Sequence, residues 1–304
     1  MRRACHVGLT PSDPGLVAVP WAAVGWHDRS MSRGNLVSGV CGWDYRHWQG
    51  RFYPPDLAKD QRLSFVAGAM DGVEIDTTFY GLRTPADFLR WRSQVPAGFT
   101  FAVKGSRFIT HMKRLKSARQ ALANFFASGP LALEDSLGPF LWQLPASQRW
   151  DAERVDGFLT ELPRDTDALR ALAADHDPDI VSTAFLGEGQ PCRPVRHALE
   201  PRDSSFADPQ VCAVLRAHGV AMVMADSAGQ WPTFDCDSAG FRYLRLHGTA
   251  KRKYSGSYHG KWEPWSSTAA DALEMGHDVY VFFDNDSRAQ APRDAVELSQ
   301  LLAD

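Results

Sequence analysis

The chain has 304 residues, of which 44% are hydrophobic and 23% charged, the proportions of an ordinary globular protein that is long enough to bury a sizeable core. Its formal net charge of −3 and isoelectric point near 6.4 exclude a generally basic surface, so a nucleic-acid partner is not expected. No apolar run approaches the roughly 18 residues that a membrane span requires, so a membrane partner is not expected either. The five cysteines are scattered and form no CxxC pair, which indicates a cytoplasmic protein with neither a disulfide framework nor a zinc knuckle.

The first 35 residues precede any periodic segment. The apolar stretch 16–25 is interrupted by Pro20, and no convincing small-residue cleavage site follows it, which argues against a signal peptide. Met31 begins the segment MSRGNLVSGVCGW, which favours residues 1–30 as an extension ahead of the true start. We therefore expect residues 1–35 to be a poorly ordered extension and residues 36–304 to form the folded domain.

From Leu36 onward, short apolar runs alternate with amphipathic stretches, the pattern of repeated βα units. Helices are predicted at 84–95, 117–127, 152–162, 208–219 and 292–302, with residues 164–190 as a helix followed by an irregular connection. Strands are predicted at 36–42, 72–76, 99–104, 137–144, 194–202, 220–226, 241–248 and 278–285. This series predicts an α/β fold, a single-domain (β/α)8 TIM barrel. A doubly wound sheet is the competing architecture, and it is disfavoured because no GxGxxG or P-loop motif follows a strand.

Polar residues recur near the ends of the predicted strands. Alternate side chains of a strand face opposite sides, so in FRYLRLHG the leucines would face the helices while Arg245 and His247 face the lumen. The same parity sends Glu74 of VEID and Lys104 of FAVK inward. By the same argument Glu200 and Arg202 share one side, and Gln143 and Asp226 end their strands at a similar depth. The active sites of TIM barrels lie at this carboxyl end, so these residues are candidates for a site.

Two readings of this polar set are open. In the first, Glu74, Glu200, His247 and Asp226 are catalytic, because ionisable groups from several strands meeting in one lumen suit acid–base chemistry. In the second, the charges form a structural ion network that plugs the lumen, and Asp226 caps a turn. In the loop after the last predicted strand, Asp284 is expected to be structural, whereas the roles of Asn285 and Asp286 stay open.

The loop 249–262 is basic and rich in glycine and tyrosine. Loops after the seventh and eighth strands often bind phosphate in TIM barrels, and small residues let backbone N–H groups approach an anion. The alternative is a solvated loop, which is the better interpretation for each lysine taken alone. The basic residues concerned are Lys251, Arg252, Lys253 and Lys261.

Several stretches in order resemble the bacterial YecE-like family, which is known only as a domain of unknown function. They are CGWDYRHWQGRFYP, VEIDTTFYGL, FAVKGSRFITHMKRL, LGPFLWQLP, RHALEPRDSSF, YLRLHG with YSGSY, and DVYVFFDNDSRAQAPRDA. The resemblance implies a TIM barrel, a cytoplasmic setting and no established activity. It also places the family's polar motif residues on Glu74, Tyr80, Lys104, His111, Gln143, Glu200, Arg202, Asp226, Arg245, His247, Asn285 and Asp286. Phe206 departs from the pattern, since relatives often carry tryptophan there.

Three functions remain possible, and no cofactor can be assigned. The leading hypothesis is a hydrolase or isomerase acting on an anionic or sugar-like small molecule, which would be held by Lys104, Arg202, Arg245, Tyr80, Gln143, Asn285 and Asp286. Within it, Glu74 and Glu200 would form a glycosidase pair if their carboxyl groups were suitably spaced. The first alternative is a divalent-metal phosphoesterase or nuclease with Glu74, Glu200, Asp226 and His247 as ligands. The second is a non-catalytic anion or nucleic-acid binding protein that uses the 249–262 loop.

Overall fold

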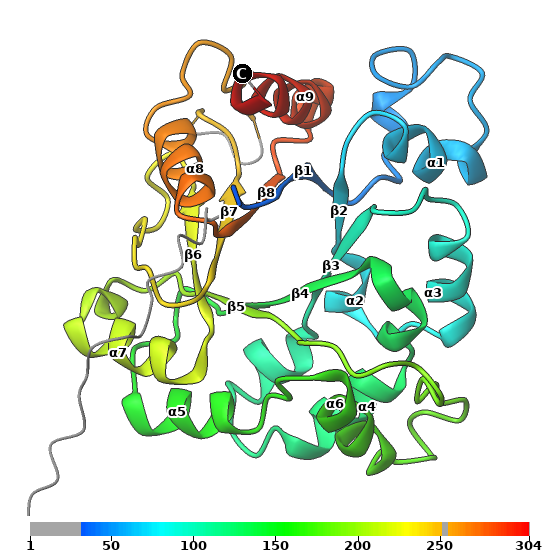
Figure 1. The fold of residues 1–304 in the computed structure, drawn as a ribbon, viewed down its shortest axis with the longest axis vertical. Coiled ribbons are helices and arrows are strands. Elements are labelled where there is room, and N and C mark those ends of the chain that lie inside the picture. Colours follow the sequence, from blue (N-terminus) through cyan, green and yellow to red (C-terminus); the bar gives the residue numbers. More distant parts are fainter. Residues whose placement is uncertain (1–31, 251–254, 304) are drawn as a thin grey trace, which may run out of the picture. The chain divides into compact units, whose positions relative to one another are not determined.

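The computed structural model describes residues 32–250 and 255–303, and residues 32–304 form one compact unit. In the described part of this unit, eight parallel strands close into a barrel in sequence order, with β8 paired to β1 (Figure 1). Helices surround the strands. The predicted single-domain (β/α)8 barrel is confirmed.

Every strand of the barrel lies inside its predicted segment. The strands were predicted from apolar runs rich in Val, Ile and Phe that are bounded by Gly, Pro and Asp. These runs mark the strands because strands of a parallel barrel are buried on both faces. The strands are β1 (Leu36–Cys41), β2 (Gly72–Ile75), β3 (Thr100–Lys104), β4 (Leu137–Gln143), β5 (His197–Glu200), β6 (Ala221–Asp226), β7 (Phe241–Leu246) and β8 (Asp278–Phe283).

Six helices occupy regions where helices were predicted, namely α3 (Pro85–Arg92), α4 (Arg119–Ala127), α5 (Ala152–Thr160), α6 (Thr166–Ala174), α7 (Pro209–His218) and α9 (Gln290–Ala303). Three others were not predicted: α1 (Arg62–Ala67), α2 (Thr77–Tyr80) and α8 (Trp265–Glu274). The first two are too short to show a helical period. The first turn of α8 reads Trp-Ser-Ser-Thr, a composition that favours turns over helix interiors unless tertiary packing decides otherwise.

The start of α3 is capped by Thr84. The Thr84 hydroxyl accepts a hydrogen bond from the backbone N–H of Asp87, and the Asp87 carboxylate accepts one in return from the backbone N–H of Thr84. Pro85 occupies the first helical position, where no N–H is needed. This capping box fixes the point at which the chain leaves the pocket wall described below.

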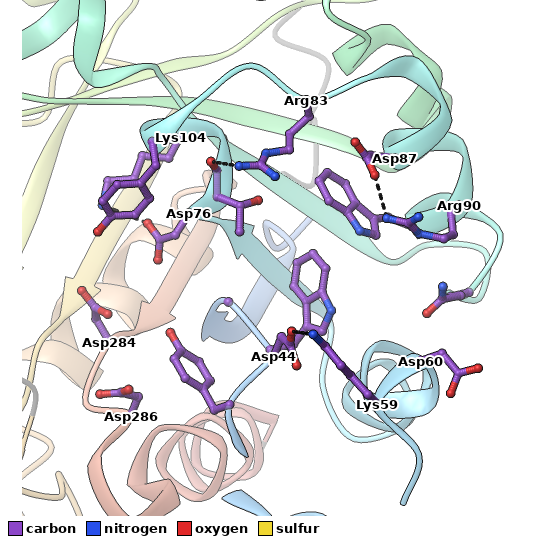
Figure 2. A pocket seen from close by; sticks show the side chains of 17 residues that line it. Asp44, Lys59, Asp60, Asp76, Arg83, Asp87, Arg90, Lys104, Asp284 and Asp286 are labelled. Atoms are coloured by element: carbon purple, nitrogen blue, oxygen red, sulfur yellow. Dashed lines mark hydrogen bonds and ion pairs between the residues drawn. The ribbon is translucent and has the colours of Figure 1, made fainter. Parts of the chain in front are cut away.

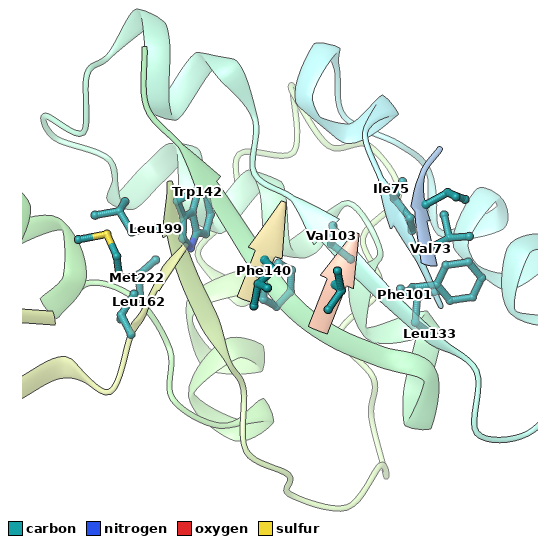
Figure 3. Packing of buried hydrophobic residues seen from close by; sticks show 14 of the residues in the cluster. Val73, Ile75, Phe101, Val103, Leu133, Phe140, Trp142, Leu162, Leu199 and Met222 are labelled. Atoms are coloured by element: carbon teal, nitrogen blue, oxygen red, sulfur yellow. The ribbon is translucent and has the colours of Figure 1, made fainter. Parts of the chain in front are cut away.

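The strands carry two apolar layers, as their parity predicted. Val73, Phe101 and Leu244 pack outward into the layer beneath the helices, part of which is shown in Figure 3. Ala102 and Tyr243 belong instead to a smaller apolar cluster inside the barrel. The lumen is therefore packed in its lower part, and polar chemistry is confined to its carboxyl end.

The expected N-terminal extension falls mostly outside the described residues, since residues 1–31 are not among them. The described part is attached to the barrel. Arg33 donates a hydrogen bond to the backbone carbonyl of Leu302, and the backbone N–H of Gly34 donates to the carbonyl of Leu273. The contacts of the barrel domain thus begin before residue 36.

One expectation from the cysteine pattern is wrong. Cys212 on α7 and Cys236 in the segment between β6 and β7 form a disulfide, with their Cα atoms 6.0 Å apart. Cys41 and Cys192 are free thiols. The pairing joins residues far apart in a scattered pattern, which spacing alone does not reveal.

Among the helices in the described residues, none is both long enough and apolar enough to cross a membrane.

Candidate active site

Arg245 fills the centre of the barrel at the carboxyl ends of the strands. Its guanidinium donates hydrogen bonds to Oε1 and Oε2 of Glu74, at 2.6 and 3.1 Å, and to Oε2 of Glu200 at 2.9 Å. The hydroxyl of Tyr243 donates a further bond of 2.5 Å to Glu74. All four side chains are fully buried. Desolvating such charges costs several kcal/mol each, so they persist only because every carboxylate oxygen is bonded.

Glu200 is held from its other side by Arg202. The Arg202 guanidinium donates two bonds to Oε1 of Glu200, at 2.9 and 2.7 Å, and stacks 3.9 Å from the ring of Trp231. Burial raises the pKa of Glu200, but the charges of Arg202 and Arg245 outweigh burial and hold the pKa well below its usual value. Glu200 is therefore an ionised structural carboxylate.

His247 connects this buried network to the surface above it. Its Nδ1 lies 2.9 Å from Oδ2 of Asp284, and its Nε2 lies 3.6 Å from Oε1 of Glu200. The ring also stands edge-on to Trp231, with centroids 5.2 Å apart. Asp284 follows β8 directly and was expected to be structural. It lines the pocket instead.

A pocket of about 880 Å³ lies over the ends of β1, β2, β3 and β8. This volume is at the upper end of the range for small-molecule sites. Figure 2 shows Asp76, Lys104, Asp284 and Asp286 on one side of the pocket, which we call the floor, and Asp44, Lys59, Asp60, Asp87 and Arg90 on the other, which we call the wall. The remaining lining residues are Gly42, Trp43, Tyr45, Thr77, Tyr80, Arg83, Trp91 and Gln94.

The floor brings two carboxylates together. Asp76 follows β2 directly, and its Oδ1 lies 2.8 Å from Nζ of Lys104 at the end of β3. One carboxylate oxygen of Asp76, one of Asp284 and the sulfur of Cys41 all lie within 4.8 Å of one another. Arg245 reaches up from the buried network to Oδ2 of Asp284 at 3.4 Å. The two acids thus share one site and share Arg245, which also lies 3.9 Å from Oδ1 of Asp76, but the cation nearest to Asp76 is Lys104.

Their environments shift the two pKa values in opposite directions. Burial raises the pKa of Asp76 to about 6; Lys104 opposes this rise, whereas the charges of Glu74 and Asp284 add to it. Burial also raises the pKa of Asp284, but the hydrogen bond from His247 and the charge of Arg245 bring it below its usual value. The pKa of Lys104 is raised because the neighbouring carboxylates outweigh its burial, so it stays charged. Of these two carboxylates, Asp76 is accordingly the one that binds a proton more readily.

Asp286 extends the acidic floor toward the loop after β1. Its backbone carbonyl accepts hydrogen bonds from His47 and from Nε1 of Trp48, both at 2.9 Å, which fastens the loops after β1 and β8 together. Burial, followed by the charge of Asp284, raises the pKa of the Asp286 side chain to about 6. At neutral pH the floor therefore carries a partly protonated acid on each side of Asp284.

The expected site residues divide into three groups. Lys104, Tyr80 and Asp286 line the pocket. A second group lies beneath or beside it, buried at the strand ends: Glu74, Glu200, Arg202, Arg245, His247 and Gln143, the last of which is paired in register with Glu200. Glu74, Glu200 and Arg245 do not line the pocket, so for these three residues the structure favours the ion-network reading. The third group, Asp226 and Asn285, serves the loop after β7.

Asp226 and Asn285 hold the chain that follows β7. The Asp226 carboxylate accepts hydrogen bonds from the Tyr258 hydroxyl at 2.8 Å and from the backbone N–H of Ala228 at 3.0 Å. The Asn285 amide donates to the carbonyl of Gly256 at 2.9 Å and to Asp294 at 2.7 Å. Both side chains therefore position loop segments. The turn-capping alternative fits Asp226 better than a catalytic role does.

The metal ligands of the phosphoesterase alternative do not converge. The Arg245 guanidinium bonds Glu74 on one side and Glu200 on the other, while Asp226 is engaged with Tyr258. In the described residues a different set, Cys41, Asp76 and Asp284, comes close enough to hold an ion. Lys104 and Arg245 already lie against these two carboxylates at 2.8 and 3.4 Å, so a divalent cation would compete with two resident cations for its ligands.

The basic loop expected to bind an anion is only partly within the described residues, since Lys251, Arg252 and Lys253 lie outside them. Lys261 is exposed. Sequence reasoning missed Tyr45 and Arg83 as lining residues, and it missed the place of Asp284 in the pocket. Asp76 and Asp284 each come directly after a strand, as a catalytic residue of a barrel does, and that position was the signal available. Arg83 lies on a loop, where no periodicity could indicate its direction.

Residues 37–304 match the family model described as "Protein of unknown function DUF72". A curated relative, the UPF0759 protein YunF of Bacillus subtilis (strain 168), is 22% identical over 296 residues, which cover 88% of this chain and 94% of YunF. A solved DUF72 family protein from Thermotoga maritima has a TM-score of 0.68 and 23% identity, covering 89% of this chain and all of that one. One from Enterococcus faecalis has a TM-score of 0.62 and 18% identity, covering 88% and 95%. These structural likenesses establish the fold.

Proposed function

The chain belongs to the DUF72 family, which has no described function, and we propose that this member is a hydrolase of sugar-like small molecules with Asp76 and Asp284 as its catalytic pair. One observation carries the proposal: an oxygen of each carboxylate lies within 4.8 Å of the other at the floor of a pocket of about 880 Å³, and this pocket lies at the carboxyl end of a (β/α)8 barrel. Sites of this fold occupy that end. Two carboxylates with pKa values moved apart are the arrangement that acid–base hydrolysis uses.

Asp76 suits the role of general acid. Its raised pKa lets it carry a proton that it can give to the leaving oxygen as the bond to that oxygen breaks. Asp284, which His247 and Arg245 hold ionised, suits the role of nucleophile: it attacks the sugar carbon from which the leaving oxygen departs. Water then attacks the covalent intermediate, giving its proton to Asp76 and its hydroxyl to the sugar, and Asp284 leaves as the carboxylate. Retaining glycosidases hold their two carboxyl groups about 5–5.5 Å apart and inverting ones about 6.5–9.5 Å apart, so a pair whose oxygens lie within 4.8 Å of each other fits the retaining class.

The charge of the pocket favours a neutral reacting centre over a phosphoester. Among the described residues, the lining contains six carboxylates and four basic side chains. Three of those carboxylates lie on the floor, where Lys104 is the one cation that lines the pocket and Arg245 approaches Asp284 from beneath at 3.4 Å. A phosphate placed on this floor would meet like charge. A glycosidic carbon that becomes positive in the transition state would instead be stabilised by it. This argument selects a sugar-like substrate from the two classes that the sequence left open.

Glycoside hydrolysis gives the most direct test. The purified protein would be assayed with 4-nitrophenyl α- and β-glycosides of common hexoses, pentoses and uronic acids, and the first anomer released would be identified by proton NMR. We expect hydrolysis of at least one compound with retention of configuration. Inversion would remove Asp284 as the nucleophile, and absence of hydrolysis across both anomeric series would remove the proposal.

Two finer expectations from the sequence stay predictions. The YecE-like name rests on the motifs quoted above. The cytoplasmic setting is harder to reconcile with the Cys212–Cys236 disulfide, because structural disulfides are rare in reducing compartments. Binding of nucleic acid is still not expected.

A further inference from the structure

Arg83 differs from the other basic residues of the pocket. Lys59 lies 3.0 Å from Asp44, Arg90 lies 2.7 Å from Asp87, and Lys104 is paired with Asp76. In the described parts of the chain, Arg83 makes no ion pair with a carboxylate, although it lines the same cavity. Figure 2 shows it between the floor and the wall, on the side of the cavity nearest α3.

The hydrogen bonding of Arg83 is also incomplete. Its Nη2 donates one bond of 3.1 Å to the backbone carbonyl of Thr77, and its buried Nε has no acceptor among the described residues. A guanidinium offers five N–H donors in a planar fork that matches a carboxylate or a phosphate. The neighbouring helix start does not compete for an anion, because the capping box of Thr84 and Asp87 already satisfies it. The positive charge offered here is that of Arg83.

An aromatic surface lines the same cavity. Trp43, in the loop after β1, is partly exposed and stands nearly perpendicular to Trp91, with ring centroids 5.5 Å apart. The contact with Trp91 fixes the Trp43 ring at low entropic cost. An indole held in this way presents an apolar platform to the C–H face of a sugar ring, and Gln94, which lines the same cavity, can bond its hydroxyls.

We infer that the substrate carries an acidic substituent, a carboxylate or a phosphate ester, that Arg83 binds while the sugar ring lies against Trp43. This inference rests on the proposed function for the bond that is cleaved, but the binding step is independent of cleavage. It also reconciles an acidic floor with an anionic ligand, because the charge of the substrate is directed to Arg83 and away from Asp76 and Asp284. Substrate charge and reaction centre thus occupy different parts of one pocket.

The test measures binding of monosaccharides, which have no glycosidic bond to cleave. Glucuronate, galacturonate, glucose 6-phosphate and glucose would each be titrated by calorimetry into the wild-type protein, Arg83→Gln and Arg90→Gln. Arg90 is the matched control, because it loses the same charge in the same pocket but is already paired with Asp87. We expect Arg83→Gln to weaken binding of an acidic probe about tenfold or more, the worth of a charged hydrogen bond, and to leave glucose unchanged.

The four probes distinguish a carboxylate ligand from a phosphorylated one, and binding measured apart from hydrolysis distinguishes this inference from the proposed function. Preference for a uronate identifies a carboxylate ligand, and preference for glucose 6-phosphate identifies a phosphorylated one. The inference is overturned if no acidic probe binds more tightly than glucose, or if Arg90→Gln weakens the acidic probe as much as Arg83→Gln does. Binding that depends on Arg83 without hydrolysis of any glycoside would overturn the proposed function alone. Equal melting temperatures of the two variants would show that both are folded.

Discussion

Arg245 and Glu74 are joined by two hydrogen bonds, of 2.6 and 3.1 Å, although they belong to strands on different sides of the barrel and neither is accessible to solvent. This pair explains why an acidic side chain interrupts the apolar segment VEID. The carboxylate neutralises a buried guanidinium that in turn reaches Glu200 and Asp284. The ion pair therefore sets the position of the pocket floor without touching a ligand.

Breaking this pair is expected to cost stability. Glu74→Gln should lower the free energy of unfolding by about 3–5 kcal/mol, because it removes one of the two buried carboxylates that pair with Arg245 and leaves it only Glu200, which Arg202 shares, and the partly exposed Asp284. Urea denaturation followed by circular dichroism measures the change. Asp60→Asn is the control, an exposed carboxylate of the pocket wall whose loss should change stability by less than about 0.5 kcal/mol. Full stability together with lost hydrolysis would instead make Glu74 catalytic.

The catalytic pair makes a different prediction. Asp76→Asn should lower kcat about 10²–10⁴-fold for a glycoside with a poor leaving group, because the general acid is lost, and change KM little. With a 4-nitrophenyl leaving group, which needs little protonation, the loss should be smaller. Asp60→Asn, the same chemical change in the same pocket, serves as the control. An Asp76→Asn variant as active as wild type on both substrates would contradict the assignment.

The dependence of activity on pH follows from the same two groups. Hydrolysis needs Asp76 protonated and Asp284 ionised, and the pKa of Asp76 is about 6, whereas that of Asp284 is below its usual value. Values of kcat/KM should thus be highest below pH 6 and fall as pH rises through about 6. Initial rates between pH 4 and 8 measure this. A basic limb that persists unchanged in Asp76→Asn would assign it to another group.

Asp286 offers a test of the floor that does not need a substrate. Its pKa is raised from 3.8 to about 6 in the folded protein, so its contribution to stability is fully present below pH 3.8 and is lost as pH rises through 6. Asn cannot ionise. Asp286→Asn should accordingly be more stable than wild type at pH 8, by up to about 3 kcal/mol, and equal to it at pH 4. Denaturation curves at both pH values test the sign; the reverse order would show that ionised Asp286 is stabilised.

The cations beside the floor also predict the effect of a chelator. Because Lys104 and Arg245 already lie against Asp76 and Asp284, prolonged dialysis against EDTA should change neither melting temperature nor hydrolysis. Elemental analysis of protein purified without chelator measures directly whether a metal is bound. Stoichiometric zinc or manganese, with loss of stability on its removal, would assign the cluster of Cys41, Asp76 and Asp284 to a metal.

Much of the fold could be predicted because strands of a closed barrel have a local signature. Each is an apolar run bounded by turn residues, and alternation then decides which side chains enter the lumen. Glu74, Lys104 and Arg245 were correctly directed inward for that reason. Short helices such as α2, and α8 with its Ser-rich start, were missed because tertiary packing rather than local preference stabilises them.

Within the candidate site, sequence alone determined that ionisable groups from several strands meet at one end of the barrel. It could not decide their depth, because parity distinguishes inside from outside but not a buried ion pair from a solvent-facing acid. Only the tertiary structure placed Glu74 and Glu200 around Arg245 and left Asp76 and Asp284 above it. The physical reason is that a charge takes its role from its neighbours in space, and those neighbours come from strands that are distant in the chain.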